Sequence, residues 1–222
     1  MSFCLIILAG GNSHRFRSKI GKPYQKIGGK SLIEINLIKA SKFKEIKKIV
    51  IVYNKKDSKR VKTLNLKNVK LIIGGKSRQQ STFNALKYLI KQKDTSKVLI
   101  HDAARPNFSL RFLRSIIKNM RNSKAVVPKV EIQDAIKQII DSSKEEYIIG
   151  KKRDNLFLTQ TPQAFNLKEI YYLHKKNSDK YKDDDISLYK DLNKVRFIEG
   201  EKSNFKITDK LDFENLRNIY KS

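Results

Sequence analysis

The stretch Phe3–Gly11, FCLIILAGG, decides the fold, and the loop that it opens runs on through Arg15 to Lys22. Phe3–Leu8 is an unbroken apolar run, which is typical of a strand buried on both faces of a sheet. Gly10-Gly11 follows directly, and glycine lets the chain turn sharply and approach a ligand closely. Successive free amides in such a turn form a concave anion site, to which Arg15 and Lys22 add positive charge. The stretch therefore predicts a first strand followed by a polyphosphate-binding loop.

This loop differs from two common phosphate-binding loops. No Gly-Lys-Ser/Thr ends it, as it would in a Walker loop, and the dinucleotide pattern Gly-x-Gly-x-x-Gly is absent. An ordinary glycine-rich turn after a first strand therefore stays open as the alternative.

Further along the chain, apolar runs alternate with amphipathic segments. The runs predict strands at Lys48–Val52, Val69–Ile73, Lys97–His101 and Ala125–Pro128. The segments predict helices behind a capping box at Ser31–Glu34, over Gln79–Ile90 and over Leu110–Met120. Such alternation predicts an α/β fold, a mostly parallel sheet with helices on both faces. Ligands of such sheets bind at the carboxyl ends of the strands.

The stretch Val130–Gly150 interrupts the alternation with two short β-like pieces, and we interpret it as a hairpin arm. After the arm, the pattern predicts helices at Asn166–Lys175 and Asp184–Leu192, a strand at Val195–Ile198 and a helix at Asp209–Tyr220. We expect one domain over residues 1–222, with an arm for dimerisation at about residues 130–150, because an isolated hairpin is barely stable in water.

The composition restricts the class of protein. The net charge is +27, from 49 Lys and Arg against 22 Asp and Glu, but the lysines are spread along the whole chain. This favours a solvated basic surface over a nucleic-acid-binding protein, which is the alternative from a different class. Cys4 is the only cysteine, so no intrachain disulfide can form. The first apolar run is too short to span a membrane and has no basic region before it, so we expect a cytoplasmic protein.

Two polar stretches follow predicted strands. Gly74–Ser81, GGKSRQQS, comes after the third strand and either faces the first loop or caps a helix. Ile100–Pro106, IHDAARP, comes after the fourth strand. Asp102 could bind Mg²⁺ or a substrate hydroxyl, since hard cations favour oxygen ligands; the alternative is an ion pair with Arg105 that stabilises the turn.

Two more stretches mean little in isolation. They are Arg153–Phe165, a polar loop that contains TQTPQAF, and Asn204–Thr208, NFKIT, which presents Lys206. Taken together, the motifs resemble one family from Leu8 to about Leu216, the 2-C-methyl-D-erythritol 4-phosphate cytidylyltransferases of the non-mevalonate isoprenoid pathway. The sequences of the NFKIT and TQTPQAF motifs are most similar to those of family members that are fused to the cyclodiphosphate synthase, although we expect no cyclase in this chain.

The resemblance implies a Rossmann-like nucleotidyltransferase fold, a homodimer and a reaction. The phosphate of 2-C-methyl-D-erythritol 4-phosphate attacks the α-phosphorus of CTP, the co-substrate, and pyrophosphate leaves, with Mg²⁺ as cofactor. The catalytic residues that it implies are Arg15, Lys22 and Lys206. The residues that the resemblance implies for nucleotide binding are Ala9, Gly10, Gly11, Gly75, Ser81 and Ala103. The residues that it implies for binding the acceptor are Asp102, Arg105, Arg153 and Thr161. Of these, Asp102 is also implied to bind the metal, and Arg153 to act across the dimer.

The chain departs from the family pattern mainly at the acceptor site. Ala135 stands where the family has a threonine, and Lys76 where it often has an acid. In the first loop, Asn12–His14 replace small residues and glycine. A ribitol 5-phosphate cytidylyltransferase, which shares most of the motifs, is therefore the nearest alternative.

Overall fold

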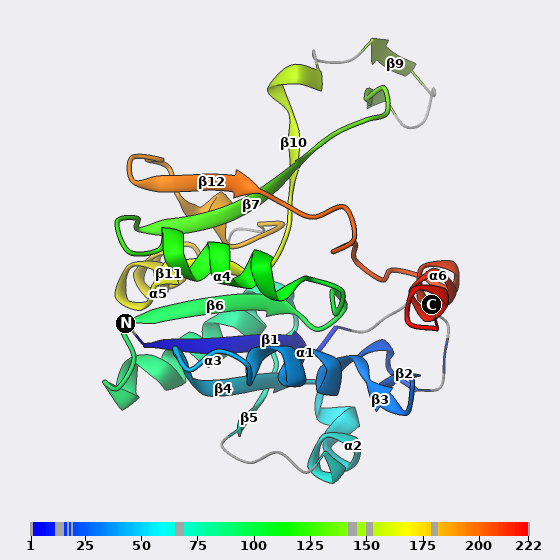
Figure 1. The fold of residues 1–222 in the computed structure, drawn as a ribbon. Coiled ribbons are helices and arrows are strands. Elements are labelled where there is room, and N and C mark those ends of the chain that lie inside the picture. The colour runs from blue at the N-terminus through cyan, green and yellow to red at the C-terminus, as the bar shows by residue number, and fades with distance from the viewer. Residues whose placement is uncertain are drawn as a thin grey trace.

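The central element of the computed structural model is a mixed β-sheet with helices on both faces (Figure 1). The structure describes residues 2–11, 16, 18, 20–64, 69–141, 146–149, 153–178 and 182–221. Arg15 and Asn12–His14, which the sequence places in the first loop, lie outside the described residues.

The strands of the main sheet follow the order β10-β7-β11-β6-β1-β4-β5, and β12 also pairs with β7. They are β1 (Phe3–Ala9), β4 (Ile46–Tyr53), β5 (Val69–Ile73), β6 (Lys97–Asp102), β7 (Ala125–Glu131), β10 (Phe157–Thr159), β11 (Gln163–Asn166) and β12 (Val195–Glu199). The pairs β6-β1, β1-β4, β4-β5 and β7-β12 are parallel, so the predicted mostly parallel sheet is confirmed.

The first strand lies between two hydrophobic cores, and its residues alternate between them. Phe3, Leu5 and Ile7 face the core built with α1 (Leu32–Ala40) and α4 (Leu110–Asn119). Cys4 and Ile6 face the core built with α3 (Arg78–Gln92) and α5 (Leu167–Lys176). Because both faces of β1 are buried, its sequence is a continuous apolar run rather than an alternating one.

The predicted helices other than the one over Asp184–Leu192 are present, with ends that differ by a few residues at most. Both halves of the capping box form: Ser31 Oγ accepts from Glu34 N at 3.2 Å, and Glu34 Oε2 accepts from Ser31 N at 2.7 Å. The last helix, α6 (Lys210–Ile219), packs Phe213 and Leu216 in a third core with α1. Elements that the sequence analysis did not predict are α2 (Ser58–Thr63), the hairpin β2 (Lys26–Ile27) and β3 (Lys30–Ser31), and the 3₁₀ turns η2 (Lys22–Tyr24), η3 (Lys55–Asp57), η4 (Arg153–Asn155) and η5 (Ile186–Leu188).

Two predictions in the last third of the chain are wrong. The stretch Arg153–Phe165 is not only a loop, since β10 and β11 run antiparallel to β7, and β11 also pairs antiparallel with β6. Each of these strands is too short to show an alternating pattern. The helix predicted over Asp184–Leu192 is a single 3₁₀ turn, because Asp184 Oδ1 accepts from both the backbone N and the hydroxyl of Ser187 and organises a turn instead.

The hairpin arm is confirmed. β8 (Lys137–Asp141) pairs antiparallel with β9 (Glu146–Ile149), and Figure 1 shows β7 leading out of the sheet toward this hairpin. Residues 142–145 and 150 of the arm lie outside the described residues. Within the described ranges, no helix combines the length and the apolar character that crossing a bilayer requires.

Candidate active site

A cavity of about 780 Å³ opens at the carboxyl ends of β1, β4, β5 and β6. This is the edge of the sheet where a parallel α/β fold binds its ligands. The sequence-predicted residues that line the cavity are Ala9, Gly10, Gly11, Lys22, Gly75, Ser81, Asp102 and Lys206. Residues from both ends of the chain therefore meet in one hollow.

The two glycine loops form the cavity wall in different ways. A Cβ at Gly11 would meet nothing within 4 Å, so this position is open toward the cavity. A Cβ at Gly75 would lie 2.3 Å from the Cγ of Gln80, so the two residues approach closely. Ser81 Oγ accepts from Gly75 N at 3.1 Å and donates to Ser77 O at 2.8 Å. The serine hydroxyl thus fixes the second loop from within, while Ser77 is the residue that caps α3.

Two lysines enter the cavity from segments far apart in the sequence. Lys22 begins η2, and its Nζ donates to Ile207 O at 2.6 Å. Lys206, beside Ile207, places its Nζ 2.7 Å from Asp102 Oδ2. The Asn204–Thr208 segment therefore connects the end of the first loop with the end of β6.

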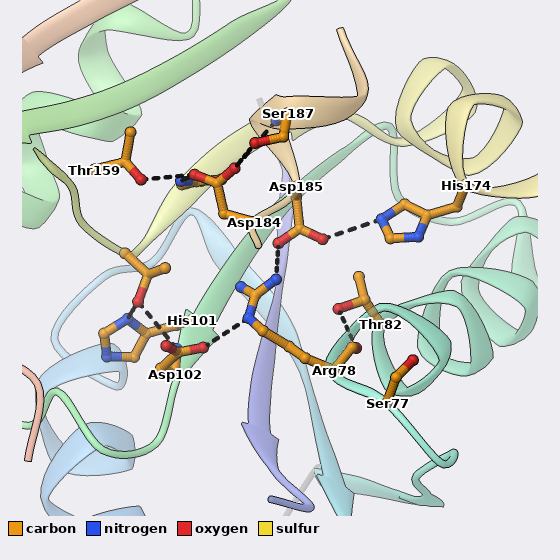
Figure 2. A network of polar contacts seen from close by, with 12 residues as sticks. Ser77, Arg78, Thr82, His101, Asp102, Thr159, His174, Asp184, Asp185 and Ser187 are labelled. Carbon is orange, nitrogen blue, oxygen red and sulfur yellow. Dashed lines mark hydrogen bonds and ion pairs between the residues drawn. The ribbon is translucent and has the colours of Figure 1, made fainter. Parts of the chain in front are cut away.

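Asp102 is the only carboxylate among the described residues of the cavity wall. Its Oδ1 accepts from Arg78 Nε at 3.2 Å and its Oδ2 pairs with Lys206 (Figure 2 shows the Arg78 contact). Burial alone would raise the pKa of Asp102, but the charges of Arg78 and Lys206 outweigh burial and hold this pKa well below its usual value. The alternative from the sequence, an ion pair between Asp102 and Arg105, is wrong. Asp102 pairs with Arg78 and Lys206, and Arg105 Nη1 donates to Asn204 O at 2.9 Å.

Behind Asp102, a buried polar chain fixes the end of β6. Thr161 Oγ1 accepts from Asp102 N at 3.0 Å and lies 3.0 Å from His101 Nδ1. Burial lowers the pKa of His101 to about 3, so its ring is neutral. Nε2 faces two acceptors, Asn36 Oδ1 at 2.9 Å and Arg105 O at 3.0 Å, so it carries the one ring hydrogen. Nδ1 then accepts from the threonine hydroxyl.

We expect the substitution Thr161→Val to lower the free energy of unfolding by about 1–3 kcal/mol, the typical cost of leaving a buried polar group without its partner. Valine keeps the shape but loses the oxygen that Asp102 N and His101 share. Urea denaturation of the two proteins measures the difference. Thr63→Val, at an exposed helix end, serves as the control and should change stability by less than about 0.5 kcal/mol. Equal effects of the two substitutions would contradict this role of Thr161.

Several predicted site residues do not line the cavity. Thr161 and Arg105 lie behind Asp102, as described above, and Arg153 Nη1 donates to Gln133 O at 2.8 Å on the arm. Ala103 is fully buried, its N donates to Leu8 O at 3.1 Å, and its O accepts from Asn36. Its neighbour Ala104 lines the cavity instead.

Arg78 is the residue of the cavity wall that the sequence analysis missed. It stands inside the quoted stretch Gly74–Ser81, yet it received no role. It is the first residue of α3 and bridges Asp102 to Asp185, which lies far along the chain. A cation in the first turn of a helix, where acids are favoured, was the available signal. Asn54, Ser77, Asn84 and Thr208 also line the cavity.

Known proteins of one family are similar to this chain in sequence and in fold. The profile of the 2-C-methyl-D-erythritol 4-phosphate cytidylyltransferase family matches residues 3–221. The chain is 42% identical to a bifunctional enzyme IspD/IspF of Pelagibacter ubique, over 97% of this chain and 57% of that protein, so it spans little more than half of this relative. It is 32% identical to a 2-C-methyl-D-erythritol 4-phosphate cytidylyltransferase of Thermosipho africanus, over 91% of each chain.

A solved structure shows the same fold. The 4-diphosphocytidyl-2C-methyl-D-erythritol synthase of Anaerococcus prevotii superposes with a TM-score of 0.84 at 31% identity, over 100% of this chain and 96% of that one. The match of the profile over nearly the whole sequence is sufficient to assign the family. This chain belongs to the 2-C-methyl-D-erythritol 4-phosphate cytidylyltransferase family, a family of nucleotidyltransferases.

Proposed function

We propose that this chain transfers the cytidylyl group of CTP to 2-C-methyl-D-erythritol 4-phosphate. The products are 4-diphosphocytidyl-2-C-methyl-D-erythritol and pyrophosphate. The observation that carries the proposal is the cavity itself, in which the Gly10-Gly11 loop, Lys22 and Lys206 surround the Asp102 carboxylate. Cations and the backbone amides of a glycine-rich turn suit a polyphosphate, and the family assignment supplies the identity of the two substrates.

The reaction asks the protein to align two anions and to stabilise charge. An oxygen of the acceptor phosphate forms a bond to the α-phosphorus of CTP, and the bond from that phosphorus to pyrophosphate breaks. Lys22 and the glycine loop bind the triphosphate, and Lys206 leaves Asp102 to stabilise the charge that develops on the α-phosphoryl oxygens. Asp102, once released by Lys206, accepts from a hydroxyl of the acceptor. Arg15 would add a further cation to the triphosphate.

The cavity fits a magnesium ion that is held jointly by protein and substrate. The described residues contain no cluster of three or more His, Cys, Asp or Glu that could hold a metal. Mg²⁺ is commonly bound by one or two carboxylates together with substrate phosphates, and Asp102 is the carboxylate in the right place. Bound there, Mg²⁺ would neutralise charge on the phosphates.

We also propose that the active protein is a homodimer in which Arg153 serves the neighbouring site. Arg153 lies just beyond the arm, its Nη1 donates to Gln133 O on the arm, and it does not line the cavity of its own chain. Phe157 and Leu158, on β10 next to the arm, are 40% and 56% exposed, and a second copy would cover them. Two-fold dimers are the commonest symmetric assemblies. Location in the cytoplasm stays a prediction of the sequence.

The test is a pyrophosphate-release assay with each of the four nucleoside triphosphates and two acceptors. We expect turnover that needs a divalent cation, with CTP and 2-C-methyl-D-erythritol 4-phosphate as the preferred pair. Preference for ribitol 5-phosphate would assign the alternative acceptor, to which the departures at Ala135 and Lys76 point. Equal turnover with UTP or ATP, or none with either acceptor, would overturn the proposal.

A further inference from the structure

Arg78 lies between two carboxylates, one in the cavity wall and one behind it (Figure 2). Its Nε donates to Asp102 Oδ1 at 3.2 Å, and its Nη1 donates to Asp185 Oδ2 at 2.8 Å. The guanidinium is planar and rigid, so fixing the direction of Nη1 also fixes the direction of Nε. The contact with Asp185 therefore determines how Arg78 meets Asp102.

Asp185 is a buried residue outside the cavity wall. Its side chain is 1% exposed, and its second oxygen, Oδ1, lies 3.0 Å from His174 Nε2. Burial alone would raise the pKa of Asp185, but Arg78 and His174 outweigh burial and lower it. An ionised carboxylate can only accept hydrogen bonds, so Nε2 of His174 carries the hydrogen and donates it to Asp185.

His174 is held in turn by the packing of α5 on α3. Its ring stacks on that of Phe83, with 6.3 Å between the ring centroids and 6° between the planes. Phe83 also stacks on Tyr171, at 5.7 Å between centroids. No residue of α5 lines the cavity, yet this helix sets the position of Asp185. A chain of contacts thus leads from the α3–α5 interface to the cavity wall.

We propose that Asp185 and His174 are positioning residues, which hold the Arg78 guanidinium so that it orients the Asp102 carboxylate toward the acceptor. The inference rests on the proposed function, in which Asp102 meets the acceptor or its metal. The competing explanation is that Asp185 and His174 only attach α5 to the sheet and stabilise the fold. The two explanations differ in what they predict for Arg78 and for the kinetics of the acceptor.

Asp184 provides a matched control, because it stands beside Asp185 in the same turn. Its carboxylate accepts from Thr159 Oγ1 at 2.6 Å and from Ser187 Oγ at 2.5 Å. Its hydrogen-bond partners among the described residues are Thr159, Gln163 and Ser187 and do not include Arg78, and Figure 2 shows it directed to the other side of the turn. Asp184→Asn therefore weakens the same turn as Asp185→Asn and leaves the two contacts of Arg78 in place.

We expect Asp185→Asn to lower kcat/KM for 2-C-methyl-D-erythritol 4-phosphate by on the order of tenfold to a hundredfold, the scale for a misplaced group in an active site. Asp184→Asn should change kcat/KM by less than about twofold, although it should lower the thermal unfolding temperature about as much as Asp185→Asn does. In an Arg78→Met background, Asp185→Asn should cause no further loss, because it acts through Arg78. Equal losses from the two aspartate substitutions, or multiplied losses in the double variant, would overturn the inference.

Two substitutions of His174 separate hydrogen bonding from packing. His174→Gln keeps a side-chain N–H for Asp185 and loses the aromatic ring, whereas His174→Phe keeps the stacking on Phe83 and loses the donor. We expect His174→Phe to lower kcat/KM as Asp185→Asn does, and His174→Gln to keep most of the activity. The reverse order would show that His174 acts by packing alone. These variants also test the inference if Asp185→Asn fails to fold.

The side-chain Nε–H signal of Arg78 in an NMR spectrum gives a readout that needs no turnover. In the unsubstituted protein we expect a resolved, slowly exchanging signal, because the guanidinium is held at both ends. This signal should move into the envelope of free arginines in Asp185→Asn and stay in place in Asp184→Asn. A signal that stays in both variants would overturn the inference. A protein that shows the expected signals but no transfer to methylerythritol phosphate would instead overturn the proposed function.

Discussion

Replacement of Lys206 by alanine is expected to lower kcat by about a hundredfold or more while the protein stays folded. Lys206 is the cation of the C-terminal segment that reaches the cavity, and its Nζ lies 2.7 Å from Asp102 Oδ2. Loss of a donor that stabilises developing charge commonly costs about two to three orders of magnitude in rate. The side chain is 43% exposed and packs in no core, so the unfolding temperature should stay close to that of the unsubstituted protein.

The measurement is steady-state pyrophosphate release at saturating CTP and acceptor. Lys202→Ala is the control, since Lys202 is an exposed lysine shortly before Lys206 in the same segment and does not line the cavity. The control should keep its activity within about twofold, because an isolated surface charge contributes little. If Lys206→Ala and Lys202→Ala have the same kcat, Lys206 acts only as surface charge.

The sequence predicted the sheet and most of the cavity because these features are local. Phe3–Leu8 is apolar throughout, as a strand buried on both faces must be, and Gly10-Gly11 marks its end. The other loops also follow strand ends, so the topology of a parallel sheet brings them together. Sequence order and general rules were sufficient to place Gly75, Asp102 and Lys22 at one edge.

The pairing of side chains within the site could not be predicted in the same way. Asp102 had a nearby candidate partner in Arg105, and a short separation favoured that pair. In the structure Asp102 pairs with Arg78 and Lys206, which the sheet order brings to it from both directions along the chain. Such choices depend on the direction of each side chain at the end of its element, and this direction has no signature in a single sequence.

The error at Asp184–Leu192 has a comparable cause. The residues there are compatible with a helix, but Asp184 uses its carboxylate to organise a turn and to bind Thr159 on β10. Asp185 next to it turns inward to Arg78. Two tertiary contacts therefore override a weak helical preference, and they do so where the site needs support.

Replacement of Lys22 by alanine is the second substitution with a large expected effect. Lys22 is the described cation that closes the first loop, and its Nζ is held 2.6 Å from Ile207 O at the cavity wall. Since the triphosphate loses a donor, we expect kcat/KM for CTP to fall by about a hundredfold or more. Lys26→Ala, at an exposed position of β2, should behave like the unsubstituted protein. A normal kcat/KM in Lys22→Ala would remove Lys22 from the site.

The same variant tests the proposed dimer when it is mixed with Arg153→Ala. If Arg153 serves the neighbouring site, each mixed dimer contains one site with both Lys22 and Arg153 and one site with neither. Random exchange of two-fold dimers makes half of them mixed, so about a quarter of the normal activity should return. No recovery after proven subunit exchange would place Arg153 in its own chain's site or outside any site. A fully active monomer would exclude the dimer as the functional unit, and the arm next to Arg153 would then need another partner.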